Sequence, residues 1–232
     1  MKHFIVTLLV GFWLLGPHAF ADVNAKNGIS ITTASTINGK TPNSAFNGLT
    51  IVSGGGASFS DNFNRSDRFP ITPDWTNGFS GWGDFGINTN RAQGGGINSL
   101  AAVAVSTVTF AANQSAQATL VAGTVDFCGP VVRVQSDGSC YAASSIGGGQ
   151  MRIYKFTGST PTTPFSDFTA TGVAGDTLTI TASSTGTVTL ELFHNGVSLG
   201  TRNDSSSPYN SGQPGMWAGA SIFLEDFVAV DL

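Results

Sequence analysis

The sequence predicts an all-β protein, folded as an antiparallel β-sandwich. From Phe59 onward, several segments alternate apolar and polar residues, which is the pattern of strands with one buried face. Turns rich in glycine and Asn-Gly pairs separate these segments, and no stretch shows the apolar period of an amphipathic helix. Only 10% of the 232 residues are charged, whereas 30 are glycine. This composition excludes a coiled coil or a helical bundle.

The first 21 residues predict a secretory signal peptide. Lys2 and His3 precede an apolar run from Phe4 to Leu15, and an Ala-Phe-Ala cleavage sequence ends at Ala21. The run is shorter than the roughly 20 apolar residues that cross a bilayer. We therefore expect a mature chain without a transmembrane segment. Its expected location is extracellular, at the cell surface or in the periplasm.

Residues 22–57 predict a linker or an extended arm ahead of the domain at 58–232. The segment has low periodicity and ends in a glycine triplet. It carries three Asn-Gly pairs, at Asn27-Gly28, Asn38-Gly39 and Asn47-Gly48. Their spacing is too short and irregular for a solenoid repeat. The arm is also the candidate segment for self-association.

The clearest strands of the domain lie between residues 177 and 200. Three segments alternate there, with an expected buried set of Leu178, Ile180 and Ala182, then Val188, Leu190 and Leu192, then Val197 and Leu199. The turns between them are Ser183–Gly186 and Asn195-Gly196, of which the second is a strong hairpin signal. Together they predict a three-stranded antiparallel meander.

A second hairpin is expected in CGPVVRVQSDGSCYAAS, with its turn at Asp137-Gly138. A two-residue turn places Cys140 opposite Gln135, so Cys128 lies roughly 20 Å away at about 3.3 Å per residue. This exceeds the reach of a disulfide, although export favours one, and predicts two unpaired cysteines. Further strands are expected at Ser106–Phe110, Gln117–Ala122, Gln150–Phe156 and Ile222–Val230.

Four sequence stretches resemble a known family when they are taken in order. They are FSDNFNRSD, DWTNGFSGWGDFGINTNRA, GDTLTITASSTGTVTLELFHNGVSLGT and SGQPGMWAGASIFLEDFVAVDL. Residues 58–232 are thereby similar to bacterial and phage laminin-G-like domains. This resemblance implies a concanavalin A-like jelly roll whose first and last strands pair. It implies no single function, because the architecture hosts lectins, glycanases, adhesins and structural modules.

An enzymatic function is not expected. Retaining glycosidases need two carboxylates about 5 Å apart, and the family's glycanases carry them in an E-x-D-x-E or E-x-D-x-x-E motif. This chain has only Glu191 and Glu225, far apart in sequence. The GVSLG segment around Ser198 matches a nucleophile motif, but it lies in a hairpin arm rather than at a strand-to-helix elbow. His194 at the hairpin end is then a solvated turn residue.

Oxygen ligands gather at the two ends of the domain, which are expected to pair. Asp61, Asp67 and Asp226 are the candidate calcium ligands, since calcium binds six to eight oxygens. No D-x-D-x-D-G loop is present. The alternative is that Arg65 pairs with one carboxylate and Asp67 caps a turn.

Aromatic residues in loop-rich segments provide candidate contacts to sugar rings. Trp82, Tyr209 and Trp217 are expected at a rim or concave face, with Asp84 and Asn210 as polar neighbours. Trp75 matches the core position of the resembled family and is expected to be buried.

The leading interpretation is a secreted, non-catalytic module that binds polysaccharide or a surface glycan. A structural or adhesive component of the cell surface is the alternative, and a divergent glycan-active enzyme is the second alternative. The net charge of −4 argues against a nucleic-acid partner, which would favour a basic surface.

Overall fold

A computed structural model describes residues 21–25, 29–33, 56–95, 101–121 and 125–232. The predicted signal peptide up to residue 20 and all three Asn-Gly pairs of the arm lie outside these ranges. The chain divides into two units, residues 1–45 and 46–232. In the first, β1 (Ala21–Ala25) pairs with β2 (Ile29–Thr33) in an antiparallel register.

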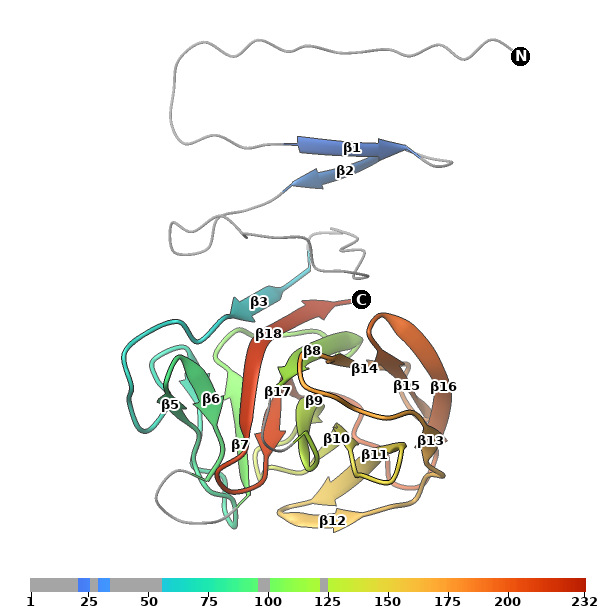
Figure 1. The fold of residues 1–232 in the computed structure, drawn as a ribbon. Helices are drawn as coiled ribbons and strands as arrows, with labels where there is room; N and C mark the ends of the chain where they lie inside the picture. Colours follow the sequence, from blue (N-terminus) through green and yellow to red (C-terminus); the bar gives the residue numbers. More distant parts are fainter. Residues whose placement is uncertain (1–20, 26–28, 34–55, 96–100, 122–124) are drawn as a thin grey trace, which may run out of the picture. The chain divides into compact units, whose positions relative to one another are not determined.

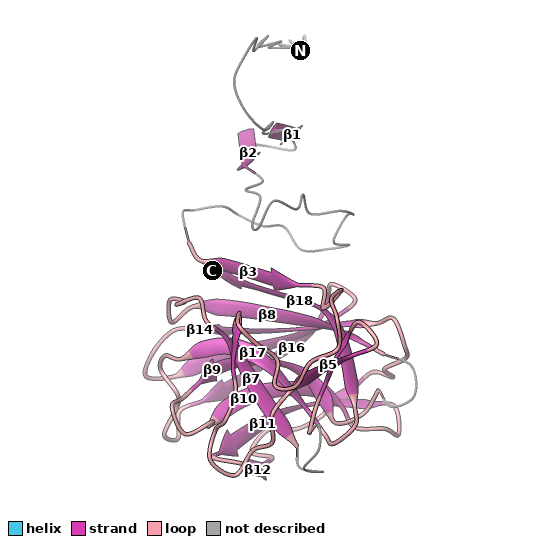
Figure 2. Ribbon diagram, turned by 90° about the vertical axis from the view of Figure 1, so that its left-hand side faces the viewer, coloured by secondary structure: helices cyan, strands magenta, loops and turns pink. Residues whose placement is uncertain are grey.

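The second unit consists of two antiparallel sheets that form a sandwich (Figures 1 and 2). Sheet I has the order β12 (Thr160–Thr162), β11 (Gln150–Thr157), β10 (Cys140–Ser145), β9 (Cys128–Val134), β17 (Gln213–Ala218), β7 (Ala102–Ser106), β4 (Trp75–Thr76), with β13 (Phe168–Thr169) beside β11. Sheet II has the order β16 (Val197–Asp204), β15 (Val188–His194), β14 (Thr177–Ser183), β8 (Gln114–Leu120), β18 (Phe223–Asp231), β6 (Arg91–Gln93), β5 (Gly86–Asn88), with β3 (Ser58–Asp61) beside β18.

The predicted meander is present as β14, β15 and β16. The expected inward residues of β14 and β15 are fully buried between the sheets. Asn195 and Gly196 both have positive φ, which is the conformation that a tight hairpin turn requires. The prediction for β16 was wrong, because Val197 is 66% exposed and Leu199 only half-buried. A register shift after Leu192 and the position of β16 at the sheet edge account for this.

The second hairpin, formed by β9 and β10, is also present, but its register differs from the prediction. Gln135 N donates to Ser139 O (2.8 Å), so the turn contains more than two residues. Tyr141 lies opposite Val132. Arg133, whose φ of 56° interrupts the regular strand, precedes the turn.

The two cysteines are unpaired and buried, as predicted. Cys128 belongs to the main core between the sheets, whereas Cys140 belongs to a separate cluster of apolar residues. Successive residues of a strand point to opposite faces, and the two cysteines face opposite sides of sheet I. Burial raises the pKa of the Cys128 thiol to about 12, and the charge of Asp126 adds to the shift.

Two other strands lie closer to the N-terminus than predicted. The predicted strand at Ser106–Phe110 is replaced by β7, which ends at Ser106, and β8 ends at Leu120 rather than at residue 122. Both strands consist mainly of small residues that are buried on both faces, so their alternation is weak. β11 and β18 match their predicted ranges within one residue.

The pairing of the first and last strands of the domain is confirmed by β3 and β18, where Phe59 lies opposite Ala229 (Figure 2). The contact extends one residue further toward the arm. Ala57 N donates to Asp231 Oδ2 (2.8 Å), and Asp231 N donates to Ala57 O (2.9 Å). The sandwich therefore includes the last residue of the predicted arm. Trp75 is buried in the main core, as expected.

Asp204 is a buried carboxylate that joins the edge of sheet II to sheet I. It accepts hydrogen bonds from Tyr141 Oη (2.6 Å), Lys155 Nζ (2.6 Å) and Ser206 N (2.9 Å). Burial alone would raise the pKa of Asp204, but the hydrogen bonds from Lys155 and Tyr141 outweigh it. They hold this pKa below its ordinary value.

Asp204→Asn is expected to lower the free energy of unfolding by about 2 kcal/mol at neutral pH, because it weakens charge-assisted bonds in a buried site. The folded-state pKa lies below the unfolded one, so the carboxylate contributes stability above about pH 4 and loses it as the pH falls further. Urea unfolding across this range should show the difference between wild type and variant shrinking in acid. Asp67→Asn, at an exposed carboxyl, is the control. A difference that stays constant with pH would contradict this account.

Candidate functional site

The outer face of sheet I carries a second apolar cluster, here called the outer cluster. Its buried members are Trp82, Val103, Val105, Val131, Val134, Cys140, Ala142, Tyr154, Phe156 and Trp217. All except Trp82 lie on β7, β9, β10, β11 or β17 and point away from the main core. An apolar outer face of this kind must be covered or must serve as a binding surface.

The loop of residues 77–83 covers one part of the outer cluster. Trp82 packs against Phe156, with ring centroids 4.9 Å apart. The indole Nε1 faces Gly138, where an added Cβ would lie 2.5 Å from it, so the loop fits closely against the β9–β10 turn. This nitrogen is buried without a hydrogen-bond partner in the described part of the chain.

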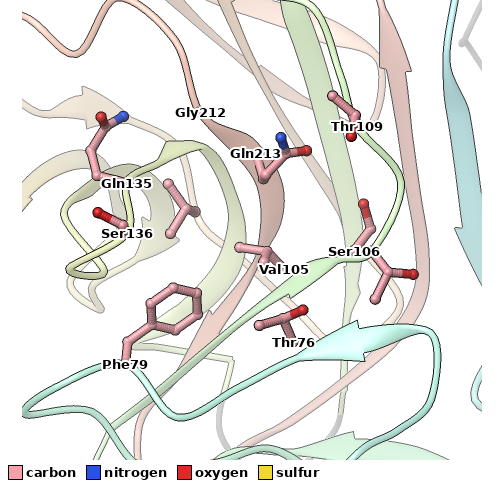
Figure 3. A pocket seen from close by; sticks show the side chains of 11 residues that line it. Thr76, Phe79, Val105, Ser106, Thr109, Gln135, Ser136, Gly212 and Gln213 are labelled. Carbon is pink, nitrogen blue, oxygen red and sulfur yellow. The ribbon is translucent and has the colours of Figure 1, made fainter.

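The other part of the outer cluster is open and forms a groove of about 560 Å³ beside Phe79 (Figure 3). Its lining residues come from β4, β7, β9 and β17 and from the loops at their ends: Thr76, Phe79, Val105, Ser106, Thr107, Thr109, Val134, Gln135, Ser136, Gly212 and Gln213. Val105 and Val134 belong to the outer cluster and line the base of the groove, but they are only 5% and 3% exposed, so the half-buried Phe79 provides the more accessible apolar surface. Neighbouring strands are about 4.8 Å apart, so the groove extends about 14 Å across the four strands.

The rim of the groove is polar and uncharged. Gln135 uses its amide nitrogen to bind Arg133 O (2.8 Å) and Ser211 O, which leaves its Oε1 free among the described residues. Gln213 Oε1 accepts from Phe110 N (3.3 Å), and its Nε2 has no protein partner within the same ranges. Ser136 is exposed beside them. The groove thus offers an acceptor, a donor and a hydroxyl around an aromatic ring.

Trp217 and Trp82, two of the predicted sugar contacts, lie together in the outer cluster but are buried. Trp217 is 4% exposed. Its ring packs against Tyr154 and Phe156, at centroid distances of 5.6 and 5.2 Å, and its Nε1 donates to Ala143 O. Neither tryptophan presents an open face to a ligand, because the loop that carries Trp82 closes over this part of the sheet.

The other three predicted contacts are dispersed. Tyr209 is half-buried, stacks on Tyr141 (5.1 Å between centroids) and donates to Phe156 O (2.8 Å). Asn210 Oδ1 accepts from Gly186 N (2.9 Å). Asp84 directly follows the loop of residues 77–83 and is half-buried. The residues that line the groove instead, Phe79 and Gln135 above all, had no distinguishing sequence signal, since they are a lone aromatic and a lone amide in turns.

The three candidate calcium ligands are not brought together. Asp61 binds Arg65 through both carboxylate oxygens (2.6 and 2.8 Å) and also accepts from Trp75 Nε1 (2.7 Å). Asp67 Oδ1 accepts from Thr89 N (2.8 Å), and Asp226 is exposed on β18. Within the described ranges, no group of three or more His, Cys, Asp or Glu is placed to hold a metal ion. The donor set therefore does not fit a calcium site, and the Arg65 ion pair is the alternative that the sequence had left open.

The acidic and nucleophilic residues considered for catalysis each have a separate partner. Glu225 pairs with Arg91 (2.6 Å), and Glu191 accepts a hydrogen bond from Ser198. His194 binds Asp176 Oδ2 (2.7 Å) and makes no hydrogen bond to Ser198. Among the described residues, no helix is long and apolar enough to span a membrane.

Comparison with solved structures finds the same type of sandwich in several proteins. A carbohydrate-binding module, CBM66 from Bacillus subtilis, is 13% identical and covers 68% of this chain and 92% of its own, with a TM-score of 0.48. A β-1,3-1,4-glucanase (lichenase) derived from a mouse hindgut metagenome is 10% identical and covers 75% of this chain and 98% of its own, with a TM-score of 0.49. No protein-family model and no curated protein sequence matches the chain.

The chain is an all-β sandwich of two antiparallel sheets. The similar structures include both binding modules and hydrolases. At these identities the likeness concerns the fold alone, so function has to be argued from the groove itself.

Proposed function

We propose that this chain is a non-catalytic module that binds neutral carbohydrate in the groove beside Phe79. The observation that carries the proposal is the combination of a half-buried aromatic ring, Phe79, with an uncharged rim of amides and hydroxyls (Figure 3). Sugar rings have apolar C–H faces and hydroxyls that both donate and accept hydrogen bonds. The groove offers a partner to each of these features.

The polar partners are positioned by the fold rather than by the ligand. Gln135 is held by its two bonds to backbone carbonyls, and Gln213 by its bond from Phe110 N. Because these amides are already ordered, binding costs little side-chain entropy. None of the described residues that line the groove is charged, which suits a neutral polysaccharide.

The same lining supports a binding role over a hydrolytic one. Glycoside hydrolysis uses two carboxyl groups at the scissile bond. No Asp or Glu lines the groove within the described ranges. The signal-peptide pattern of residues 1–21 supports a location outside the cytoplasm, where polysaccharides are accessible.

Isothermal titration calorimetry of the chain with neutral polysaccharides tests the proposal. Phe79→Ala is expected to weaken binding about tenfold, the effect of losing a stacking ring worth about 1.4 kcal/mol. Ser136→Arg, a change at an exposed rim position, should block the groove without disturbing the core. Because no charge takes part, affinity should be nearly independent of salt.

Phe127→Ala is the matched control, because it removes an equally large ring that is 50% exposed elsewhere. Thermal unfolding of each variant verifies that the sandwich is intact. Wild-type affinity in both Phe79→Ala and Ser136→Arg, or no binding of any neutral polysaccharide, would overturn the proposal.

A further inference from the structure

A second pocket lies at the end of sheet II, where β5 is the edge strand and the loop after β3 packs alongside it (Figure 1). We call it the edge pocket. Its volume is about 490 Å³, and its lining includes Asp67, Arg68, Phe69, Gly86, Asn88 and Gln93. None of these residues lines the groove beside Phe79.

Phe69 gives the edge pocket an accessible aromatic surface. Its side chain is 39% exposed, one of the few large apolar side chains of the described residues that remain open to solvent. Gly86 provides the space for this ring, since an added Cβ would lie 2.9 Å from Phe69 Cδ2. The ring therefore packs with one part against the strand and leaves the rest free to contact a ligand.

The polar groups of the pocket retain unused hydrogen-bonding capacity. Asn88 Nδ2 donates to Gln93 Oε1 (3.0 Å), which leaves the Asn88 oxygen and the Gln93 nitrogen without a partner in the described structure. Asp67 uses Oδ1 to accept from Thr89 N, and its Oδ2 makes no bond within those ranges. The edge pocket thus combines two acceptors, an amide donor and an aromatic ring.

This chemistry favours a polyol over other ligands. A peptide ligand could not pair with β5 as an added strand at Ile87. The N–H and C=O of Ile87 are already bonded to the backbone of Arg68 (2.7 and 3.0 Å). Asp67 and Arg68 are the two charged lining residues and carry opposite charges, so the lining as a whole favours neither an anion nor a cation. Asp67 is the only carboxylate among them, which is too few for a calcium ion. Hydroxyl groups can use acceptors and donors that lie side by side.

We propose that the edge pocket is a second carbohydrate-binding site, which takes a single sugar residue with its ring against Phe69. It goes beyond the proposed function because it stands on different residues and on a different sheet. Two sites on one chain allow the module to bind two glycan segments at once, so that affinity for a polymer exceeds affinity for a short oligosaccharide.

The test uses the full chain with its groove disabled. Calorimetric titration of Phe79→Ala with a panel of neutral tetrasaccharides of glucose, galactose, mannose and N-acetylglucosamine should retain binding of at least one sugar. Adding Phe69→Ala is expected to weaken this residual binding about tenfold. Adding Asp67→Asn, which keeps an oxygen for Thr89 N, should also weaken it. Adding Phe127→Ala should leave it unchanged.

The outcomes separate the two proposals. If Phe79→Ala abolishes all tetrasaccharide binding, or if its residual binding survives both Phe69→Ala and Asp67→Asn, the edge pocket is not a sugar site. The groove proposal survives the first of these results. If Phe69→Ala abolishes binding and Phe79→Ala does not affect it, the edge pocket stands and the groove fails. Absence of tetrasaccharide and polysaccharide binding in the wild type overturns both.

Discussion

Arg133→Ala is expected to lower the melting temperature of the sandwich by about 10 °C. Arg133 is fully buried, and its guanidinium donates to three backbone carbonyls: Ala112 O (2.9 Å), Tyr209 O (2.9 Å) and Ser184 O (2.7 Å). These carbonyls belong to three separate segments of the chain. Removal of the side chain leaves all three acceptors without this donor and opens a cavity.

The expected cost is about 4 kcal/mol, because a buried acceptor left unpaired costs more than its hydrogen bond contributed. At about 2–4 °C per kcal/mol for a domain of this size, the melting temperature should fall accordingly. Within the described ranges, the bonds of the guanidinium go to carbonyls and not to a carboxylate. Burial therefore lowers the pKa of Arg133, although the group remains protonated.

Differential scanning calorimetry measures this effect. Arg202→Ala is the matched control, since Arg202 also donates to backbone carbonyls (Ser166 O, 2.9 Å; Thr201 O, 2.8 Å) but lies partly in solvent. The melting temperature of Arg202→Ala should fall much less than that of Arg133→Ala. An equal fall in melting temperature in the two variants would show that the burial of Arg133 adds nothing to the stability that its hydrogen bonds provide.

Trp217→Ala is expected to destabilise the protein by about 3–5 kcal/mol, the usual cost of truncating a buried tryptophan. The ring is buried and packs against Tyr154 and Phe156, so its loss leaves a large void in the outer cluster. Trp217→Phe should cost less, because it keeps an aromatic ring in place.

Chemical denaturation in urea, together with a binding titration, distinguishes this role from the sugar contact that the sequence suggests. A buried ring predicts a large loss of stability with affinity changed only indirectly. If Trp217→Ala instead keeps full stability and loses glycan affinity, then the loop opens in solution and the ring contacts the ligand.

The sequence predicts this fold well where residues of different size alternate. In β14 and β15, threonine or glutamate alternates with leucine and isoleucine, so the buried face is evident. In β7, alanines face the main core and valines face the outer cluster, so both faces are apolar and buried. In β8, small alanines alternate with serine and glutamine that are buried as well. A period of two cannot be recognised when both faces carry small residues.

The binding surface was harder to predict than the fold. A tryptophan contributes equally well to a core or to a sugar site, and only tertiary contacts decide which. Trp217 is buried against Tyr154 and Phe156, which lie more than 60 residues earlier in the sequence. Similarly, Asp61 is a plausible metal ligand in sequence, but in the structure it forms an ion pair with Arg65 and accepts a hydrogen bond from Trp75.

The two cysteine thiols can report which part of the structure opens, because they lie in different apolar clusters. Burial suppresses the reactive thiolate of both cysteines, most strongly for Cys140, so neither should react with an alkylating reagent in the native state. Cys140 lies in the outer cluster and Cys128 in the main core. Opening of the outer cluster would expose Cys140 alone, whereas global unfolding would expose both thiols. The ratio of the two alkylation rates therefore distinguishes local opening of the outer face from global unfolding, without an engineered cysteine.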